Sequence, residues 1–124
     1  MHPNVSESIG PLTPAVFHIL LVLAGKEAHG YAIMNHIDRM TDRRVRLGPG
    51  TLYRSIYKMT LDGLIEQVDQ RGSSVDERRL TYRITRRGLE VARAEARRLE
   101  ALVRLARRRG LLGDSSETRR TAQS

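Results

Sequence analysis

The amino-acid sequence predicts a mainly helical α+β fold, in which three helices precede a two-stranded β-hairpin and one long C-terminal helix. Apolar residues recur at helical spacing in successive segments of residues 13–63. Apolar and polar residues then alternate in residues 64–69 and 80–85, on either side of a polar turn, as in two half-buried strands. Residues 86–109 form a last helical segment with almost no helix-breaking residues.

The first helix is expected to begin at Thr13 and Pro14, because threonine caps helix N-termini and proline is tolerated at the first helical position. The apolar run from Ala15 to Ala24 follows, and Gly25 ends the helix. Since this run is apolar on most sides, we expect the helix to lie at the centre of the fold.

A second helix is expected over residues 30–41, where Ile33, Ile37 and Met40 fall on one face. Its outer face carries polar and aromatic side chains at four-residue spacing, namely Tyr31, Asn35 and Arg39. The third helix follows a short polar connection, begins near Pro49 or Thr51 and ends at Asp62-Gly63.

The third helix has two different faces. At 100° per residue, Leu52, Ile56 and Met59 form one apolar stripe. The other side carries Arg54, Tyr57 and Lys58, with Tyr53 at the flank. Taken alone, such a helix fits a merely solvated surface as well as a binding surface.

The order of elements is that of a winged helix-turn-helix, whose third helix packs one face on the core and presents the other to the DNA major groove. In such a helix arginine would contact guanine, and the hydroxyls of Thr51 and Ser55 would contact phosphate. The expected parts are a flexible arm (residues 1–11), the DNA-binding domain (12–85), a C-terminal dimerisation helix (86–112) and a disordered tail (113–124).

The composition restricts the classes of function. The chain has 124 residues, no cysteine, a formal net charge of +8 and a sequence pI near 10.9. Most of the charge falls on residues 86–109, where nine arginines oppose three glutamates. The charge predicts a polyanionic partner, nucleic acid first. With no cysteine, no signal peptide and no apolar run near the ~20 residues of a membrane span, we expect a soluble cytoplasmic protein.

Neither a metal site nor an enzyme is supported. His29 and His36 are seven residues apart on the second helix, too distant for an i, i+4 ligand pair. His29 is expected to cap or pack at the start of that helix instead. Because no nucleophile elbow and no phosphate-binding loop occurs, we expect no catalytic residues, no metal and no cofactor.

An apolar pattern with steps of three and four residues runs along the last helix. A wide apolar stripe on a terminal helix predicts a partner subunit. We therefore assign the dimer interface to Leu89, Ala92, Ala96, Leu99, Leu102, Val103 and Ala106. Packing on the helix's own domain is the alternative, and it stays open for Leu89 and Ala92.

Several motifs, in order and at matching intervals, resemble those of PadR-family transcriptional regulators. They include HGYAI (residues 29–33), LGPGTLY (47–53), DGLIE (62–66) and YRITRRG (82–88). The resemblance extends over about residues 12–112. It implies a homodimeric winged-helix repressor, with the third helix in the major groove, the wing near the minor groove, and in many members relief by a small molecule.

The resemblance also implies which side chains contact DNA. They are Tyr31 and Asn35 on the second helix, Thr51, Tyr53, Arg54 and Lys58 on the third, and Arg78 and Arg79 in the wing. To these we add the Ser55 hydroxyl and Arg71 beside the wing tip. The chain departs from the family at Thr81-Tyr82, where members often carry two aromatic residues. With no tryptophan and only Phe17 as phenylalanine, an aromatic pocket for flat drugs is not supported.

The sequence therefore predicts a homodimeric repressor that binds double-stranded DNA at an inverted-repeat operator. A small-molecule effector is a further partner implied by the resemblance, and no membrane partner is expected. Two alternatives stay open. One is a winged-helix module for protein assembly, whose cations are only solvated, and the other is a basic RNA-binding protein.

Overall fold

The computed structural model describes residues 10–68 and 80–113. Its elements, in chain order, are α2 (Pro14–Gly25), β1 (Ala28–His29), α3 (Gly30–Met40), α4 (Pro49–Leu61), β2 (Ile65–Gln67), β3 (Thr81–Ile84) and α5 (Arg86–Arg108). The predicted fold class is confirmed, and the helices begin and end close to the expected residues. The predicted arm and tail lie almost entirely outside the described residues.

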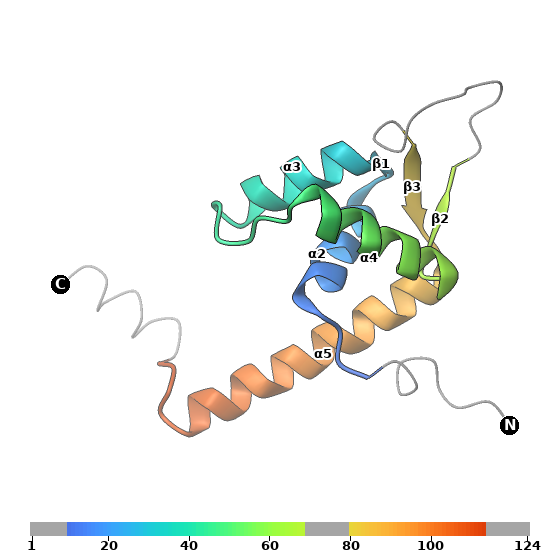
Figure 1. The fold of residues 1–124 in the computed structure, drawn as a ribbon. Helices are drawn as coiled ribbons and strands as arrows, with labels where there is room; N and C mark the ends of the chain where they lie inside the picture. Colours follow the sequence, from blue (N-terminus) through green and yellow to red (C-terminus); the bar gives the residue numbers. More distant parts are fainter. Residues whose placement is uncertain (1–9, 69–79, 114–124) are drawn as a thin grey trace, which may run out of the picture.

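The central position expected for α2 is confirmed. The hydroxyl of Thr13 caps the helix by accepting a hydrogen bond from the Val16 N–H at 3.2 Å, and Pro14 lies in the first turn. Ile19 and Leu20 are fully buried. The helix contacts α3, α4, α5 and β3, and Figure 1 shows it enclosed between α3 and α4 on one side and α5 on the other.

The sheet has one strand more than the predicted hairpin. Its order is β1-β3-β2, with both pairs antiparallel, so β3 is the central strand. His29 pairs with Thr81, and its Nδ1 lies 2.9 Å from the Thr81 hydroxyl. The Gly30 N–H donates to the carbonyl of Leu80 at 3.3 Å. These contacts fix the start of α3 to the base of the wing.

A close backbone contact joins the hairpin to α5. A Cβ added to Gly88 would collide with the carbonyl oxygen of Leu64, and it would lie 2.8 Å from Cγ1 of Ile84. The hydroxyl of Thr85 holds the same corner, because it donates to the Gly63 carbonyl at 2.6 Å and accepts from the Gly88 N–H at 3.0 Å. Residue 88 is therefore glycine for lack of space.

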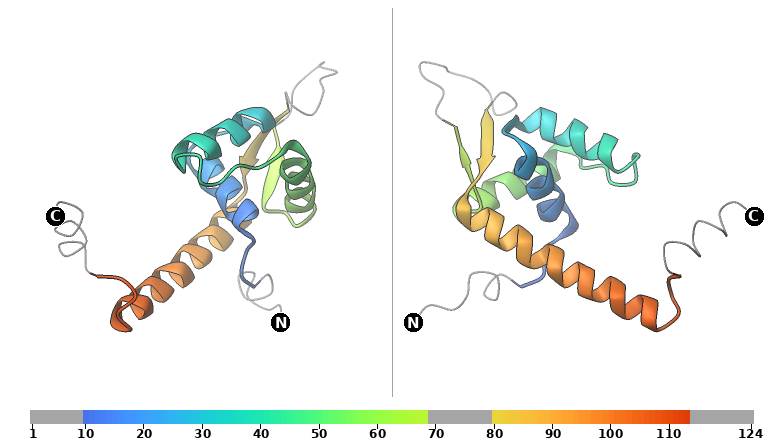
Figure 2. Two further views of the ribbon diagram at one scale, coloured as in Figure 1. Left: turned by 60° about the vertical axis from the view of Figure 1, so that its left-hand side comes forward. Right: turned by 180° about the vertical axis from the view of Figure 1, so that it is seen from behind.

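The two halves of α5 have different surroundings. The first half packs on α2 and β3, and Val91 is 3% exposed. The second half extends away from the rest of the described chain (Figures 1 and 2). There Leu102 is 48% exposed and Val103 is 42% exposed. The helix therefore projects an apolar surface that its own domain does not cover.

Candidate nucleic-acid interface

The start of α4 leaves backbone N–H groups available for a ligand. Gly48 is the N-cap and makes no side-chain capping bond, and Pro49 occupies the first turn. The first amide with a partner inside the helix is that of Leu52, which donates to the Gly48 carbonyl at 3.0 Å. The amides of Gly50 and Thr51 precede it, and the positive end of the helix dipole suits a phosphate oxygen there.

The two faces predicted for α4 are found in the structure. Leu52, Ile56 and Met59 are at most 3% exposed and complete the core. The opposite side chains are exposed, namely those of Thr51, Arg54, Tyr57 and Lys58, and Ser55 is half-buried at the edge. Arg54 makes one long contact, from Nη2 to the Thr51 hydroxyl at 3.4 Å. Among the described residues, neither Arg54 nor Lys58 forms an ion pair.

Tyr53 lies between the two faces and packs inward. It is half-buried against the core. Its ring is so close to the start of α3 that a Cβ added to Gly30 would lie 2.9 Å from both Cε1 and the hydroxyl oxygen. The structure therefore gives Tyr53 a packing role between α4 and α3. The DNA contact expected of it from the sequence stays a prediction.

The outer face of α3 carries the two contacts predicted for that helix. Tyr31 is 51% exposed and Asn35 is exposed one turn further along. His29 is the N-cap of α3 but makes no side-chain capping bond, because its ring faces Thr81 instead. Its expected position at the helix start is thus confirmed, and its ring hydrogen-bonds to Thr81 instead of capping α3.

The turn between α3 and α4 carries exposed cations next to the candidate interface, which were not among the residues predicted from the sequence. The Thr41 hydroxyl closes this turn by donating to the Ile37 carbonyl at 2.8 Å and accepting from the Val45 N–H at 3.1 Å. Within it Arg43 has a φ of 65°, and Arg43 and Arg44 are both exposed. Two adjacent arginines in the connection before α4 were the signal that could have identified them.

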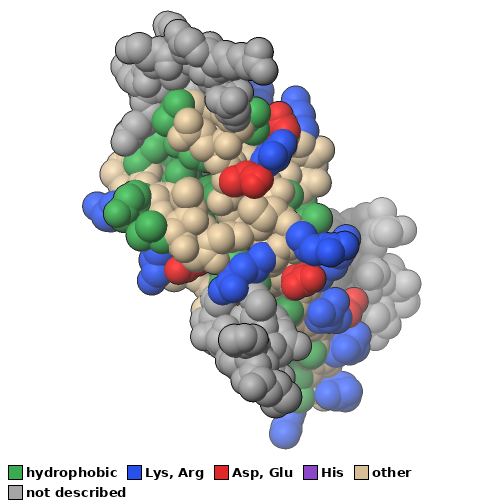
Figure 3. All heavy atoms as spheres, turned by 90° about the vertical axis from the view of Figure 1, so that its right-hand side faces the viewer, with side chains coloured by type: hydrophobic (Ala, Val, Ile, Leu, Met, Phe, Trp, Pro, Cys, Tyr) green, Lys and Arg blue, Asp and Glu red, His purple; other side chains and the backbone are tan. Residues whose placement is uncertain are grey.

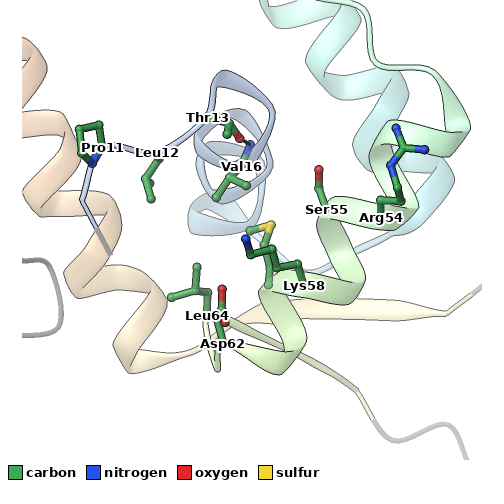
Figure 4. A pocket seen from close by; sticks show the side chains of 10 residues that line it. Pro11, Leu12, Thr13, Val16, Arg54, Ser55, Lys58, Asp62 and Leu64 are labelled. Carbon is green, nitrogen blue, oxygen red and sulfur yellow. Dashed lines mark hydrogen bonds between the residues drawn. The ribbon is translucent and has the colours of Figure 1, made fainter. Parts of the chain in front are cut away.

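A groove runs between α4 and the segment that leads into α2. Its volume is about 290 Å³. Figure 4 shows Leu12, Val16 and Leu64 around it, with the Lys58 side chain extending into it and Asp62 below. Arg54 lies at the far end and points away from Lys58 (Figure 4). The groove thus combines an apolar floor with a lysine ammonium that also belongs to the exposed face of α4.

The cation on the described part of the wing is already neutralised. Arg83 on β3 lies 3.3 Å from the carboxylate of Glu66 and 4.0 Å from that of Glu27. Arg71, Arg78 and Arg79, which the sequence assigns to DNA, lie outside the described residues.

The residues of the expected dimer face fall into two groups along α5. Ala92 packs against the core of its own domain, Leu89 is half-buried, and Ala96 is exposed. Glu95 is the buried residue of the middle turn. The remaining predicted residues, namely Leu99, Leu102, Val103 and Ala106, lie on the projecting half. Figure 3 shows basic side chains along this descending helix with apolar side chains between them.

Two negative observations apply to the described ranges, residues 10–68 and 80–113. They contain no group of three or more histidine or acidic side chains placed to hold a metal ion. None of their helices is both long enough and apolar enough to span a bilayer.

Known proteins are similar to this chain in sequence and in fold. The family model of the transcriptional regulator PadR-like family matches residues 19–94. The transcriptional regulator Rv3488 of Mycobacterium tuberculosis is 35% identical over 102 residues, which cover 82% of this chain and 85% of that protein.

Solved structures with the same fold are more distant in sequence. A PadR family transcription regulator from Clostridium difficile superposes with a TM-score of 0.64 at 22% identity, over 77% of this chain and 97% of the other. Bacillus subtilis PadR in complex with operator DNA gives a TM-score of 0.58 at 20% identity, over 68% of this chain and 47% of that one. Family model and relative agree: the chain belongs to the PadR-like family of transcriptional regulators.

Proposed function

We propose that the chain regulates transcription by binding double-stranded DNA, with the exposed face of α4 in the major groove. The observation that carries this proposal is the division of α4 into a buried stripe and an exposed face, whose two cations, Arg54 and Lys58, form no ion pair with any residue that the structure describes. An α-helix fits the major groove, and arginine suits bidentate contact with guanine. The fold shared with an operator-bound PadR supports the same use of this helix.

The neighbouring groups have distinct roles in this arrangement. Arg54 contacts a base, and Lys58 contacts phosphate. The amides at the start of α4 and the hydroxyls of Thr51 and Ser55 bind backbone oxygens and fix the position of the helix. Tyr31 and Asn35 extend the contact along α3. The wing arginines Arg71, Arg78 and Arg79 reach the adjacent minor groove.

The proposed assembly is a cytoplasmic homodimer that represses by occupying an inverted-repeat operator. The apolar surface of the projecting half of α5 supports dimerisation, because monomeric proteins seldom leave such a stripe in water. Two copies related by a two-fold axis would present two α4 helices, which a genome-scale specificity requires.

Removal of the α4 cations tests the DNA-binding face. Arg54→Ala is expected to lower affinity for the preferred base by about 1–3 kcal/mol and to relax specificity at one position. Lys58→Ala is expected to weaken binding to all sequences evenly and to reduce the salt slope by about one. Arg104→Ala serves as the control, since it removes one positive charge from an exposed ion pair on α5.

The measurement is fluorescence anisotropy with an operator selected by the full chain from random DNA. Operator affinity unchanged in the Arg54→Ala, Lys58→Ala double variant would contradict the assignment. If Arg104→Ala loses as much affinity as the α4 variants, the loss reflects the lower net charge of the protein rather than specific contacts of α4. Failure to bind any duplex at low salt would favour the protein-assembly module, and preference for RNA in direct competition would favour the RNA-binding alternative.

For relief by a small molecule, we propose the groove beside α4 as the binding site. Its floor includes Leu12 and Val16, and Lys58 extends into it, which fits a small molecule with an apolar body and an anionic group (Figure 4). Such a ligand would pair with Lys58 and compete with DNA phosphate. Octanoate is a suitable probe: release of operator DNA is expected from the wild type and not from Val16→Phe, which fills the groove. Equal release from both would place the site elsewhere.

A further inference from the structure

The exposed face of α4 carries two large apolar side chains that the electrostatic account of DNA binding does not use. Tyr57 is 68% exposed and Leu61 is 69% exposed. Neither belongs to the buried stripe, whose three members are at most 3% exposed. Nothing in the described part of the domain covers Leu61.

Helix geometry places Leu61 in line with Arg54. Seven residues turn an α-helix through 700°, so the two side chains differ by only about 20° around the axis. They are separated by about 10.5 Å along it, which is close to three base-pair steps of about 3.4 Å. Tyr57 lies between them, about 40° to one side of Leu61. A groove that accepts Arg54 along this face therefore meets Leu61 as well.

An apolar side chain has few partners in the major groove. Phosphates and the polar base edges form no favourable contact with an alkyl group. Contact with water gains nothing either, because the side chain is already hydrated in the unbound protein. The C5-methyl group of thymine is the apolar group that the major groove presents, and aliphatic side chains contact it. The exposed face of α4 thus has a cation suited to guanine at one end, Arg54, and a branched alkyl group suited to thymine at the other, Leu61.

We propose that Leu61 recognises a thymine through its C5-methyl group, about three base pairs from the base contacted by Arg54. This proposal rests on the proposed function, because it requires α4 in the major groove. Tyr57 forms the apolar wall beside Leu61. Each half-site would then contain a thymine whose methyl group, rather than its hydrogen-bonding groups, carries the preference.

Replacement of single thymines by deoxyuridine in the selected operator tests this directly, since it removes the methyl group and leaves base pairing unchanged. For the wild type, one position in each half-site is expected to weaken binding about fourfold, the effect of one buried methyl. Leu61→Ala is expected to bind the thymine and deoxyuridine operators equally. Its folding should be unaffected, because the side chain is exposed, and circular dichroism checks this.

Leu21→Ala is the matched control, because Leu21 is an exposed leucine of α2. It is expected to keep the fourfold discrimination. A wild type that binds every deoxyuridine operator as tightly as the parent would overturn the proposal, as would a Leu61→Ala variant that keeps the discrimination. Either result leaves the Arg54 and Lys58 effects on affinity intact, so failure of methyl recognition is distinguishable from failure of DNA binding itself.

Discussion

Arg98 holds the carboxylate of Glu95 with two hydrogen bonds, from Nε to Oε1 at 2.9 Å and from Nη2 to Oε2 at 2.7 Å. Glu95 is only 6% exposed, and the backbone N–H of Leu12 contributes to the lowering of its pKa. The carboxylate lies on the middle turn of α5, where the projecting half of the helix leaves the proposed DNA-binding domain.

Loss of this charge is expected to destabilise the fold. Glu95→Gln keeps the shape but replaces a charge-assisted bidentate contact by a weaker one. We expect a fall in melting temperature of about 4 °C or more by circular dichroism. Glu100→Gln is the control, because its partner Arg104 lies 3.3 Å away in an exposed pair that contributes little. Equal effects of the two substitutions would show that burial of Glu95 is without consequence.

The same site predicts a dependence of stability on pH. The hydrogen bonds from Arg98 are the main reason why the pKa of Glu95 is lowered in the folded protein. Between the lowered folded pKa and the ordinary unfolded value, the unfolded chain binds more protons, so stability rises with pH there. The contribution is complete above the ordinary pKa of glutamate and is lost as pH falls through the folded pKa. The difference in melting temperature between wild type and Glu95→Gln should therefore shrink toward pH 3, and a constant difference would contradict this.

The contact at Gly88 gives a prediction about stability with a clear sign. Gly88→Ala would place a methyl group against the backbone carbonyl of Leu64 and close to the Ile84 side chain, and a backbone carbonyl cannot rotate aside as a flexible side chain can. A cost of about 1–3 kcal/mol in the free energy of unfolding is expected in urea. Gly25→Ala is the control, because a Cβ there meets nothing within 4 Å. An unchanged Gly88→Ala protein would mean that the hairpin and α5 are less closely packed than described.

The helices were predictable because their signals are local. Thr13-Pro14 is a start signal contained in two residues, and the spacing of Leu52, Ile56 and Met59 repeats within one helix. Strand β1 was not predictable, since two residues show no periodicity. Its existence depends on pairing with Thr81 and Tyr82, more than fifty residues away in the chain.

The candidate site was predictable in part for the same reason. Periodicity separates Arg54 from the core stripe correctly, but it leaves Tyr53 at an intermediate angle. Only the position of α3 decides that Tyr53 packs on Gly30. On α5, the burial of Glu95 was not predicted, because charged residues are seldom buried without a partner. The i, i+3 spacing allows the pairing with Arg98, but the packing that buries Glu95 appears only in three dimensions.

The wing is expected to contribute affinity that depends on the flanking DNA. Arg78 and Arg79 lie outside the described residues, so this prediction rests on the sequence. Replacing both with alanine should reduce affinity most on A/T-rich flanks, whose narrow minor groove concentrates negative potential. Anisotropy titrations with A/T-rich and G/C-rich flanks around one operator measure the difference. Equal losses on both would reduce the wing to a general electrostatic contact.

The projecting half of α5 predicts both the oligomeric state and the form of the operator. Leu99→Asp combined with Val103→Asp would place like charges at the proposed seam, which is too costly without partners. A monomer that keeps its helical signal and loses specific binding is expected by light scattering and anisotropy. Ala101→Asp is the control, since Ala101 is exposed on the opposite side of the helix. The Ala101→Asp variant is expected to stay dimeric.

A dimer joined in this way has a geometric consequence for the DNA. Two α4 helices related by a two-fold axis require an inverted repeat, with half-sites about 10–10.5 bp or a small multiple apart. Footprinting on the selected operator gives this spacing. If the wild type is a monomer, or if the double aspartate variant remains dimeric and bound, the dimer interface lies elsewhere. If Ala101→Asp dissociates as well, added charge anywhere on α5 is sufficient, and the apolar stripe is not the seam.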